Sequence, residues 1–393
     1  MSSSICIHNA TVLNGFTTMK NCAVFIKENK IVDVFNEERF LKKSFDQNTV
    51  VIDAKGAYLT PGLIDTHIHG IKGYGVEDEE EKSILKMSEA LVEFGVTSFI
   101  PTLYTQSKNK MLKSIKAIAK AMGKEKGARI LGMHLEGPFI SKERLGVQKE
   151  EDVLAPSIPV LDEFLEAAQG HIINMTVAPE IKGMRELALY ALSKGIVLQA
   201  GHTNATYAQM IEAMQARIFH VTHLFNAMSR MHHRDPGVVG AVFIHPELSC
   251  EIIADGIHIN PEIIKFLLTC KSLDKVVLVT DSLKPTKQTK KPLIANGEEV
   301  YLDKCFYRKS DDAIAGSALT MIDSVKNIVS YGFHLEQAIH MAATNPARIM
   351  RQEHLGVIAP GYDADLVLLS EKLSVLYTII QGKIFEKGKP LCV

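Results

Sequence analysis

Short apolar runs alternate with helical patterns through the middle of the chain. Each run has strand length and is apolar for most of its length, as is typical of strands buried in a parallel sheet. Between them apolar residues recur with helical spacing, as at Ile84, Met87 and Leu91, and one helical segment opens at Asn260-Pro261, a favourable capping pair. The eight runs cover 62–70, 96–103, 129–137, 171–180, 196–203, 218–227, 250–258 and 276–281.

This alternation predicts eight βα units, which form a (β/α)8 TIM-like barrel. An open doubly wound sheet has the same periodicity and remains the alternative. No GxGxxG follows the first run, which disfavours a dinucleotide-binding sheet. Segment 283–313 is long for a βα loop and contains two strand-like pieces, so we expect a surface insertion with a hairpin.

The two ends of the chain share a different pattern. Residues 1–57 and 356–393 contain short strand-like stretches broken by Asn, Gly and charged residues. Neither end is long enough to build a core alone, so we expect them to pair in one small β-sandwich domain. The predicted organisation is therefore α/β, with a barrel at 58–355 and a β domain built from both termini.

Composition excludes several classes of protein. The 44 Lys and Arg residues balance 45 Asp and Glu residues, so no strongly basic field favours nucleic acid. No apolar run reaches the ~18–20 residues of a membrane span, and the N-terminal sequence does not resemble a signal peptide. The six cysteines are scattered without a CxxC pair, which indicates reduced thiols and a cytoplasmic protein.

Metal-ligand residue types stand at the ends of five predicted strands. The first strand ends in two histidines at positions i and i+2, which point the same way in extended chain. Strand ends of a barrel meet on its active-site face, so these side chains should converge. Six ligands exceed the ~4 that one zinc ion needs and suit two divalent ions with a shared carboxylate. A single buried histidine is more often a hydrogen-bonded core residue, but an apolar strand has no packing reason to end in HIH or VTH. The six residues are His67, His69, Glu136, His202, His223 and Asp281.

The motifs that contain these residues resemble a known family. PGLIDTHIHG at 61–70, after a β-rich N-terminus, resembles the opening signature of the amidohydrolase superfamily, and DADLVLL at 363–369 is similar to its closing segment. HLEGPFIS at 134–141 and THLFNAM at 222–228 resemble, more specifically, the N-acetylglucosamine-6-phosphate deacetylase family. Further matches are GHT at 201–203, ADGIH at 254–258, VTDS at 279–282 and AGSALTM at 315–321.

This resemblance implies a homodimeric enzyme of amino-sugar catabolism that removes the acetyl group of N-acetylglucosamine 6-phosphate. It implies that Glu136, His202 and His223 hold the metal common to the family, that His67 and His69 hold a second, and that Asp281 is both a ligand and the catalytic acid/base.

The resemblance also implies the substrate contacts. His258 would contact the acetamide, and Asn226, Ala227 and Arg234 the phosphate, with Arg234 reaching a neighbouring subunit. The full substrate-binding set is Val147, Gln148, Asn226, Ala227, Arg234, His258, Ile314, Ala315 and Gly316. One departure is Gln148, because many members have a histidine there, and glutamine brings no charge to a phosphate.

Some alternatives stay open. We expect zinc, and iron, manganese or cobalt also suit histidine and carboxylate ligands, with one or two ions per subunit. Another amide hydrolase or a deaminase of the superfamily is the rival function. Many such hydrolases bridge two metals with a modified lysine on strand four, where HIINMTVAPE (171–180) has none. A non-enzymatic relative of the same fold would have lost ligands, and all six are present.

Overall fold

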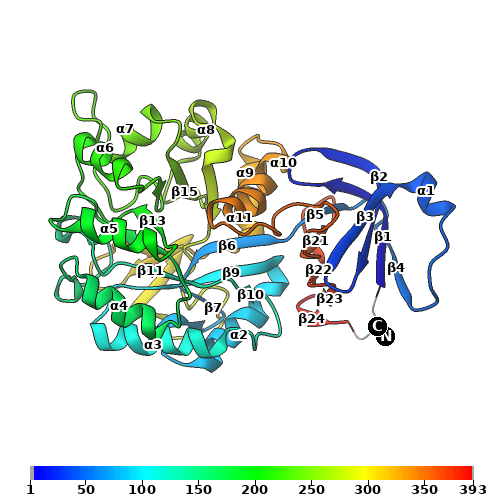
Figure 1. Cartoon of the computed structure of the whole chain (residues 1–393), viewed down its shortest axis with the longest axis horizontal. Helices are drawn as coiled ribbons and strands as arrows, with labels where there is room; N and C mark the ends of the chain where they lie inside the picture. Colours follow the sequence, from blue (N-terminus) through cyan, green and yellow to red (C-terminus); the bar gives the residue numbers. More distant parts are fainter. Residues whose placement is uncertain (1–3, 392–393) are drawn as a thin grey trace.

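Eight short strands run parallel around a closed barrel in the computed structural model, which describes residues 4–391 (Figure 1). The ring closes where Ile68 bridges Ser282, so the open-sheet alternative is excluded and the expected barrel is confirmed. Arg129–Ile130 (β10) extends the third strand. The barrel strands are β6 (Leu63–Ile68), β9 (Val96–Leu103), β11 (Met133–Glu136), β12 (Ile172–Val177), β13 (Val197–Ala200), β14 (His220–Val221), β15 (Ser249–Ile253) and β16 (Val276–Val279).

A helix follows each barrel strand. The predicted start at Asn260-Pro261 is present, because the Asn260 side chain accepts a hydrogen bond from the Glu262 N–H at 2.8 Å. Within the described residues, no helix has the length and apolar character to cross a membrane. The helices are α2 (Glu81–Leu91), α3 (Lys108–Ala121), α4 (Ile158–Ala167), α5 (Met184–Ser193), α6 (Tyr207–Gln215), α7 (Gly237–Ile244), α8 (Pro261–Cys270) and α9 (Met321–Ser330). Short 3₁₀ turns are Val76–Asp78, Val92–Phe94, Lys142–Arg144, Glu150–Asp152 and Leu273–Lys275.

Strands from both ends of the chain form one mixed sheet beside the barrel, as expected. Leu366 lies opposite Pro61, so the C-terminal strands continue the sheet begun by the N-terminal ones. The chain then passes directly into the barrel at Leu63. Domain limits at residues 57 and 355 stay predictions. The strands are β1 (Ser4–Leu13), β2 (Thr18–Lys27), β3 (Lys30–Asn36), β4 (Thr49–Asp53), β5 (Tyr58–Pro61), β21 (Leu366–Leu369), β22 (Val375–Ile380), β23 (Lys383–Glu386) and β24 (Lys389–Pro390).

Helical segments that the sequence did not predict complete the structure. Glu37–Leu41 (α1) lies at the edge of the sheet, and α10 (Leu335–Ile339), a π-helical turn (His340–Thr344) and α11 (Asn345–Ile349) lie between barrel and sheet. The five described cysteines are free thiols, and Cys392 lies outside the described residues.

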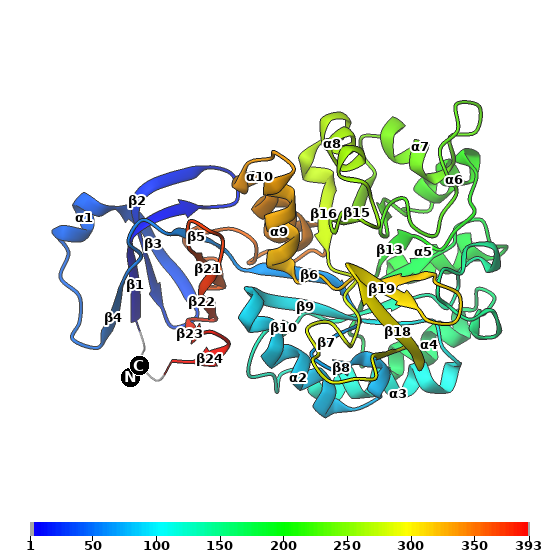
Figure 2. The ribbon, with the colours of Figure 1, turned by 180° about the vertical axis from the view of Figure 1, so that it is seen from behind.

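The insertion between β16 and α9 folds into an antiparallel sheet at the mouth of the barrel. Its strands β18 (Glu298–Asp303) and β19 (Cys305–Arg308) form the expected hairpin, in front of the barrel strands in Figure 2. The short strands β17 (Ile294–Ala295) and β20 (Ile314–Gly316) complete it, and β7 (Gly70–Ile71) pairs with β8 (Tyr74–Gly75) nearby. Phe306 packs in a cluster with Tyr104 and Leu283, so the insertion is anchored to the barrel.

The barrel seam between β6 and β16 depends on a buried polar pair. The Thr280 hydroxyl donates to Asp65 Oδ2 at 2.6 Å and accepts from the Ser282 N–H at 3.2 Å. Thr280→Val keeps the shape but leaves both partners unsatisfied, so we expect a loss of about 1–3 kcal/mol in the free energy of unfolding. Urea denaturation measures this loss. The matched change Thr269→Val on the exposed side of α8 should cost far less, and equal losses would contradict this account of the seam.

Candidate active site

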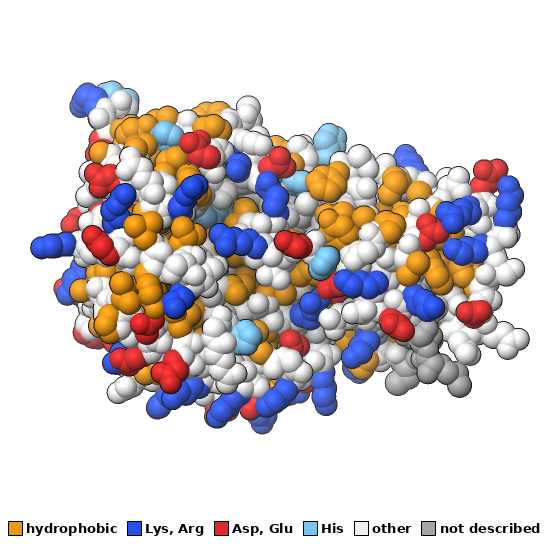
Figure 3. Space-filling model, viewed as in Figure 1, with side chains coloured by type: hydrophobic (Ala, Val, Ile, Leu, Met, Phe, Trp, Pro, Cys, Tyr) orange, Lys and Arg blue, Asp and Glu red, His pale blue; other side chains and the backbone are white. Residues whose placement is uncertain are grey.

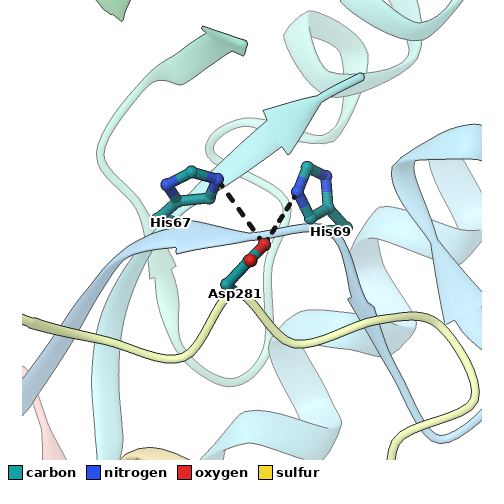
Figure 4. A group of neighbouring side chains, drawn as sticks. All are labelled: His67, His69 and Asp281. Carbon is teal, nitrogen blue, oxygen red and sulfur yellow. Dashed lines mark ion pairs between the residues drawn. The ribbon is translucent and has the colours of Figure 1, made fainter. Parts of the chain in front are cut away.

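Three ligand-type side chains meet where β6 and β16 end (Figure 4). His67 and His69 project to the same side of β6, as their spacing predicted. Nε2 of His69 lies 3.2 Å from Asp281 Oδ1, and Nε2 of His67 lies 3.7 Å from the same oxygen. The three form one group of donor atoms close enough to share a divalent ion.

A second group lies next to the first. Glu136 Oε1 is 3.1 Å from Nε2 of His202 and 3.2 Å from Nε2 of His223. The same oxygen is 3.4 Å from Nε2 of His67, and Oε2 is 3.6 Å from Nε2 of His69. Glu136 therefore lies between the two groups.

Three of these residues have left-handed backbone. The φ angle is 46° at His202, 27° at His223 and 50° at Asp281. Such angles are unfavourable for non-glycine residues, at about 1–3 kcal/mol each, and persist only where the surroundings enforce them. All three follow barrel strands, so the chain turns sharply there and directs their side chains into the site.

Hydrogen bonds fix the ring protons of three histidines. Nδ1 of His67 faces Glu251 Oε2 at 3.1 Å, Nδ1 of His69 faces the Thr102 carbonyl at 3.0 Å, and Nδ1 of His202 faces the Arg144 carbonyl at 3.1 Å. These oxygens only accept, so Nδ1 carries a proton and Nε2 is the ring nitrogen left to bind a divalent ion. Among residues 4–391, Nε2 of His67 has no hydrogen-bond partner. This donor set fits a divalent metal.

The buried charges stabilise one another. Burial alone would raise the pKa of Glu136 and of Asp281, but His202 and neighbouring imidazoles hold the pKa of Glu136 well below its usual range. A hydrogen bond with His69 similarly lowers the pKa of Asp281. For His67, burial works against the charged form, yet Glu136 and Glu251 raise its pKa well above the usual value. The site thus favours positive charge beside His67.

A cavity of about 210 Å³ opens beside these ligands. The side chain of His258 lines it, with Nδ1 2.6 Å from Asp255 Oδ2, so the other ring nitrogen is left for a ligand. The structure brings eight of the nine substrate residues expected from the sequence to this cavity: Val147, Gln148, Asn226, Ala227, His258, Ile314, Ala315 and Gly316.

Gln148 has two partners within the protein. Its Nε2 donates to Glu136 Oε2 at 2.7 Å, and its Oε1 accepts from the Thr105 N–H at 3.0 Å. Gln148 lines the cavity, but both ends of its amide are occupied by partners within the protein. Its NH₂ group orients Glu136. The structure does not bring Arg234 to the cavity; it is exposed on the loop before α7, where its guanidinium bonds to His233 at 2.8 Å. The role expected for Arg234 stays a prediction.

Two residues beside the ligands were not singled out from the sequence. Tyr104 stacks on His69, with ring centroids 3.8 Å apart, and lines the cavity. Glu251 is fully buried on β15, and although burial would raise its pKa, the neighbouring imidazoles of His220 and His67 hold that pKa well below its usual range. The signal for Glu251 was a charged residue inside the apolar run at 250–253.

A barrel with two adjacent groups of metal-ligand side chains at its mouth is typical of a metal-dependent hydrolase. The sequence profile of the Amidohydrolase family matches residues 58–385. The N-acetylglucosamine-6-phosphate deacetylase of Bacillus subtilis is 32% identical over 98% of both chains. The crystal structure of the enzyme of that name from Pasteurella multocida has a TM-score of 0.90, at 29% identity, and covers 98% of this chain and 100% of its own.

A mutant of the corresponding Mycobacterium smegmatis enzyme has been solved in complex with N-acetyl-D-glucosamine-6-phosphate. It is 26% identical, has a TM-score of 0.89, and covers 97% of this chain and 99% of its own. The chain described here belongs to the N-acetylglucosamine-6-phosphate deacetylase family of the amidohydrolases.

Proposed function

We propose that this chain hydrolyses the acetamide of N-acetylglucosamine 6-phosphate to glucosamine 6-phosphate and acetate. One observation carries the proposal: a single cavity joins Glu136 and Asp281 to His258 and to segments 146–148 and 314–316. Metal ligands, an acid/base group and polar groups for a small substrate thus share one space, and membership of the family supports the choice of sugar phosphate.

The metal centre is the first part of this proposal. We infer two divalent ions, because six nitrogen and oxygen ligands are more than one zinc ion needs. His67, His69 and Asp281 would hold one, and Glu136, His202 and His223 the other. Zinc is the expected ion, and iron, manganese and cobalt are compatible with the same ligands. When bound, a divalent ion supplies Lewis acidity and a water that loses its proton near neutral pH.

The protein's own groups handle the proton and the substrate oxygen. Asp281, held by His69, accepts the proton of the attacking water and returns it to the amine leaving group. His258, held through Nδ1 by Asp255, presents Nε2 to the acetyl oxygen of the substrate, where negative charge develops. Residues 314–316 form the wall that confines the sugar.

A second copy of the chain is the proposed partner. Large apolar side chains are exposed on α7, on α8 and on the loop before α7, and Figure 3 shows hydrophobic side chains gathered over α6 to α8. They are Met231 (53% exposed), Ile244 (53%), Phe266 (49%) and Ile263 (42%). This apolar surface adjoins Arg234, which supports a homodimer in which Arg234 reaches the neighbouring subunit's substrate.

Arg234→Ala tests phosphate recognition. Loss of a charge-assisted contact should raise KM for N-acetylglucosamine 6-phosphate about 10- to 100-fold, with little change for unphosphorylated N-acetylglucosamine. Steady-state kinetics on both sugars measure the difference. Arg230→Ala, an exposed arginine of the same loop, is the matched control. Equal effects on the two sugars would remove Arg234 from phosphate recognition.

A substrate panel tests the function against its rivals. Acetate and glucosamine 6-phosphate should appear in equal amounts from N-acetylglucosamine 6-phosphate, and slowly or not at all from a cyclic amide or an N-acyl amino acid. Ammonia release would instead indicate a deaminase. No hydrolysis of any acetylated amino-sugar phosphate by metal-loaded protein would contradict the proposal.

We also infer a cytoplasmic location, supported by the free thiols of the five described cysteines.

A further inference from the structure

Glu251 is a third carboxylate beside the six ligand side chains. It is fully buried on β15, and its two oxygens have different partners. Oε2 lies 3.1 Å from Nδ1 of His67 and accepts from the backbone N–H of His223 at 3.4 Å. Oε1 accepts from Nε2 of Gln199 at 3.1 Å and lies 3.7 Å from Nε2 of His220. Within residues 4–391 no lysine or arginine forms an ion pair with it. A buried carboxylate without such a partner is costly, so another positive charge must compensate it.

The proposed metal ions would supply the positive charge that compensates Glu251. Two divalent ions would bring four positive charges, and the ligand carboxylates Glu136 and Asp281 supply two negative ones. Glu251 adds a third negative charge on the far side of the His67 ring. Its bond to Nδ1 also leaves Nε2, which lies 3.4 Å from Glu136 Oε1, as the ring nitrogen that can bind an ion.

The two metal positions differ in the acceptor that lies behind their histidine ligands. His67 donates to a carboxylate, whereas His202 donates to the backbone carbonyls of Arg144 and Leu145 at 3.1 Å each. A carboxylate behind a histidine ligand fixes its tautomer and makes it a stronger ligand. The position of His67, His69 and Asp281 therefore has Glu251 directly behind a ligand ring. At the position of Glu136, His202 and His223, Glu251 contacts only the backbone N–H of His223, a bond that an amide oxygen can also accept.

We propose that Glu251 is the positioning residue that allows the ion at His67, His69 and Asp281 to bind. The ion at Glu136, His202 and His223 binds without it. This inference rests on the proposed two-ion centre, but its test reads metal binding and not deacetylation.

Glu251→Gln removes the charge and keeps the shape. Gln199 can accommodate the new amide, because its Oε1 has no hydrogen-bond partner among the described residues and can accept from it. Zinc is titrated into metal-free protein by calorimetry with a competing chelator, and thermal unfolding confirms the fold. We expect two ions in the unmodified protein. In Glu251→Gln the first ion should bind with unchanged affinity, and the second should bind about 10- to 100-fold more weakly.

Two further variants identify the cause. Gln199→Met removes the other side-chain hydrogen bond of Glu251 but keeps its charge and its bond to His67, so it should still bind two ions. His67→Asn should lose the second ion completely. Unchanged binding in Glu251→Gln, equal weakening of both ions, the same defect in Gln199→Met, or a single ion in the unmodified protein would overturn the inference. If the affinities separate as expected but no acetate is released from the sugar phosphate, the proposed substrate is wrong and the role of Glu251 stands.

Discussion

Replacing Asp281 with asparagine should give a folded protein whose kcat on N-acetylglucosamine 6-phosphate is about 10²- to 10⁴-fold lower. Asparagine has nearly the same shape, but its amide cannot accept the proton of the attacking water or return it to the amine. It also tolerates the left-handed backbone at this position, where φ is 50°. The backbone bonds from the Asp281 N–H to the His67 carbonyl and from the Ser317 N–H to the Asp281 carbonyl do not involve the side chain.

The measurement is kcat at saturating substrate, together with the metal content of each sample. Asp312→Asn is the matched control, because Asp312 is exposed and also has left-handed backbone, at a φ of 56°. Its turnover should stay close to that of the unmodified protein. Near-normal turnover in Asp281→Asn would show that the acid/base role belongs to another group.

Glu136→Gln should have an effect of similar size for a different reason. Glu136 Oε1 lies within 3.4 Å of imidazole nitrogens from three histidines, so its charge serves both metal positions. Gln148 donates to Oε2, and a glutamine at 136 would turn its carbonyl to that donor and its NH₂ toward the histidines. We expect bound metal to fall below one ion per chain, and acetate release to fall at least about 10³-fold, since a metal supplies several kcal/mol of stabilisation.

Metal analysis after dialysis, followed by the acetate assay, measures both effects. Glu180→Gln is the matched control, because Glu180 also follows a barrel strand but accepts from Thr203 Oγ1 at 2.5 Å and from the Asn204 N–H at 2.6 Å. It should keep its metal. Full metal content in Glu136→Gln, or an equal loss in Glu180→Gln, would show that Glu136 does not hold the metal.

The parts of the site that depend on strand periodicity could be predicted from the sequence. His67 and His69 share a side because two-residue spacing fixes that in extended chain. Glu136, His202, His223 and Asp281 converge because ends of parallel strands meet at one edge of the barrel. The sixth strand shows the limit: residues 218–227 were expected to be extended, but only His220–Val221 is a strand, since the backbone turns left-handed at His223.

Contacts set by loops and by neighbouring strands could not be predicted in this way. The bond from Gln148 to Glu136 depends on how segment 146–148 folds over the barrel mouth, which has no periodic signal. The importance of Glu251 is visible only in the folded barrel, where its side chain on β15 meets His67 on β6. Arg234 is expected to contact the phosphate of a substrate bound in a neighbouring subunit. A single chain therefore does not test this role.

The dependence of acetate release on bound metal tests the central claim most directly. Protein freed of metal by a chelator is titrated with zinc, and acetate release from N-acetylglucosamine 6-phosphate is measured beside the ions bound per chain. A metal-dependent deacetylase should release no acetate when metal-free and should regain turnover in proportion to the ions bound at Glu136, His202 and His223. Undiminished acetate release from metal-free protein, or no release from fully loaded protein, would contradict the account.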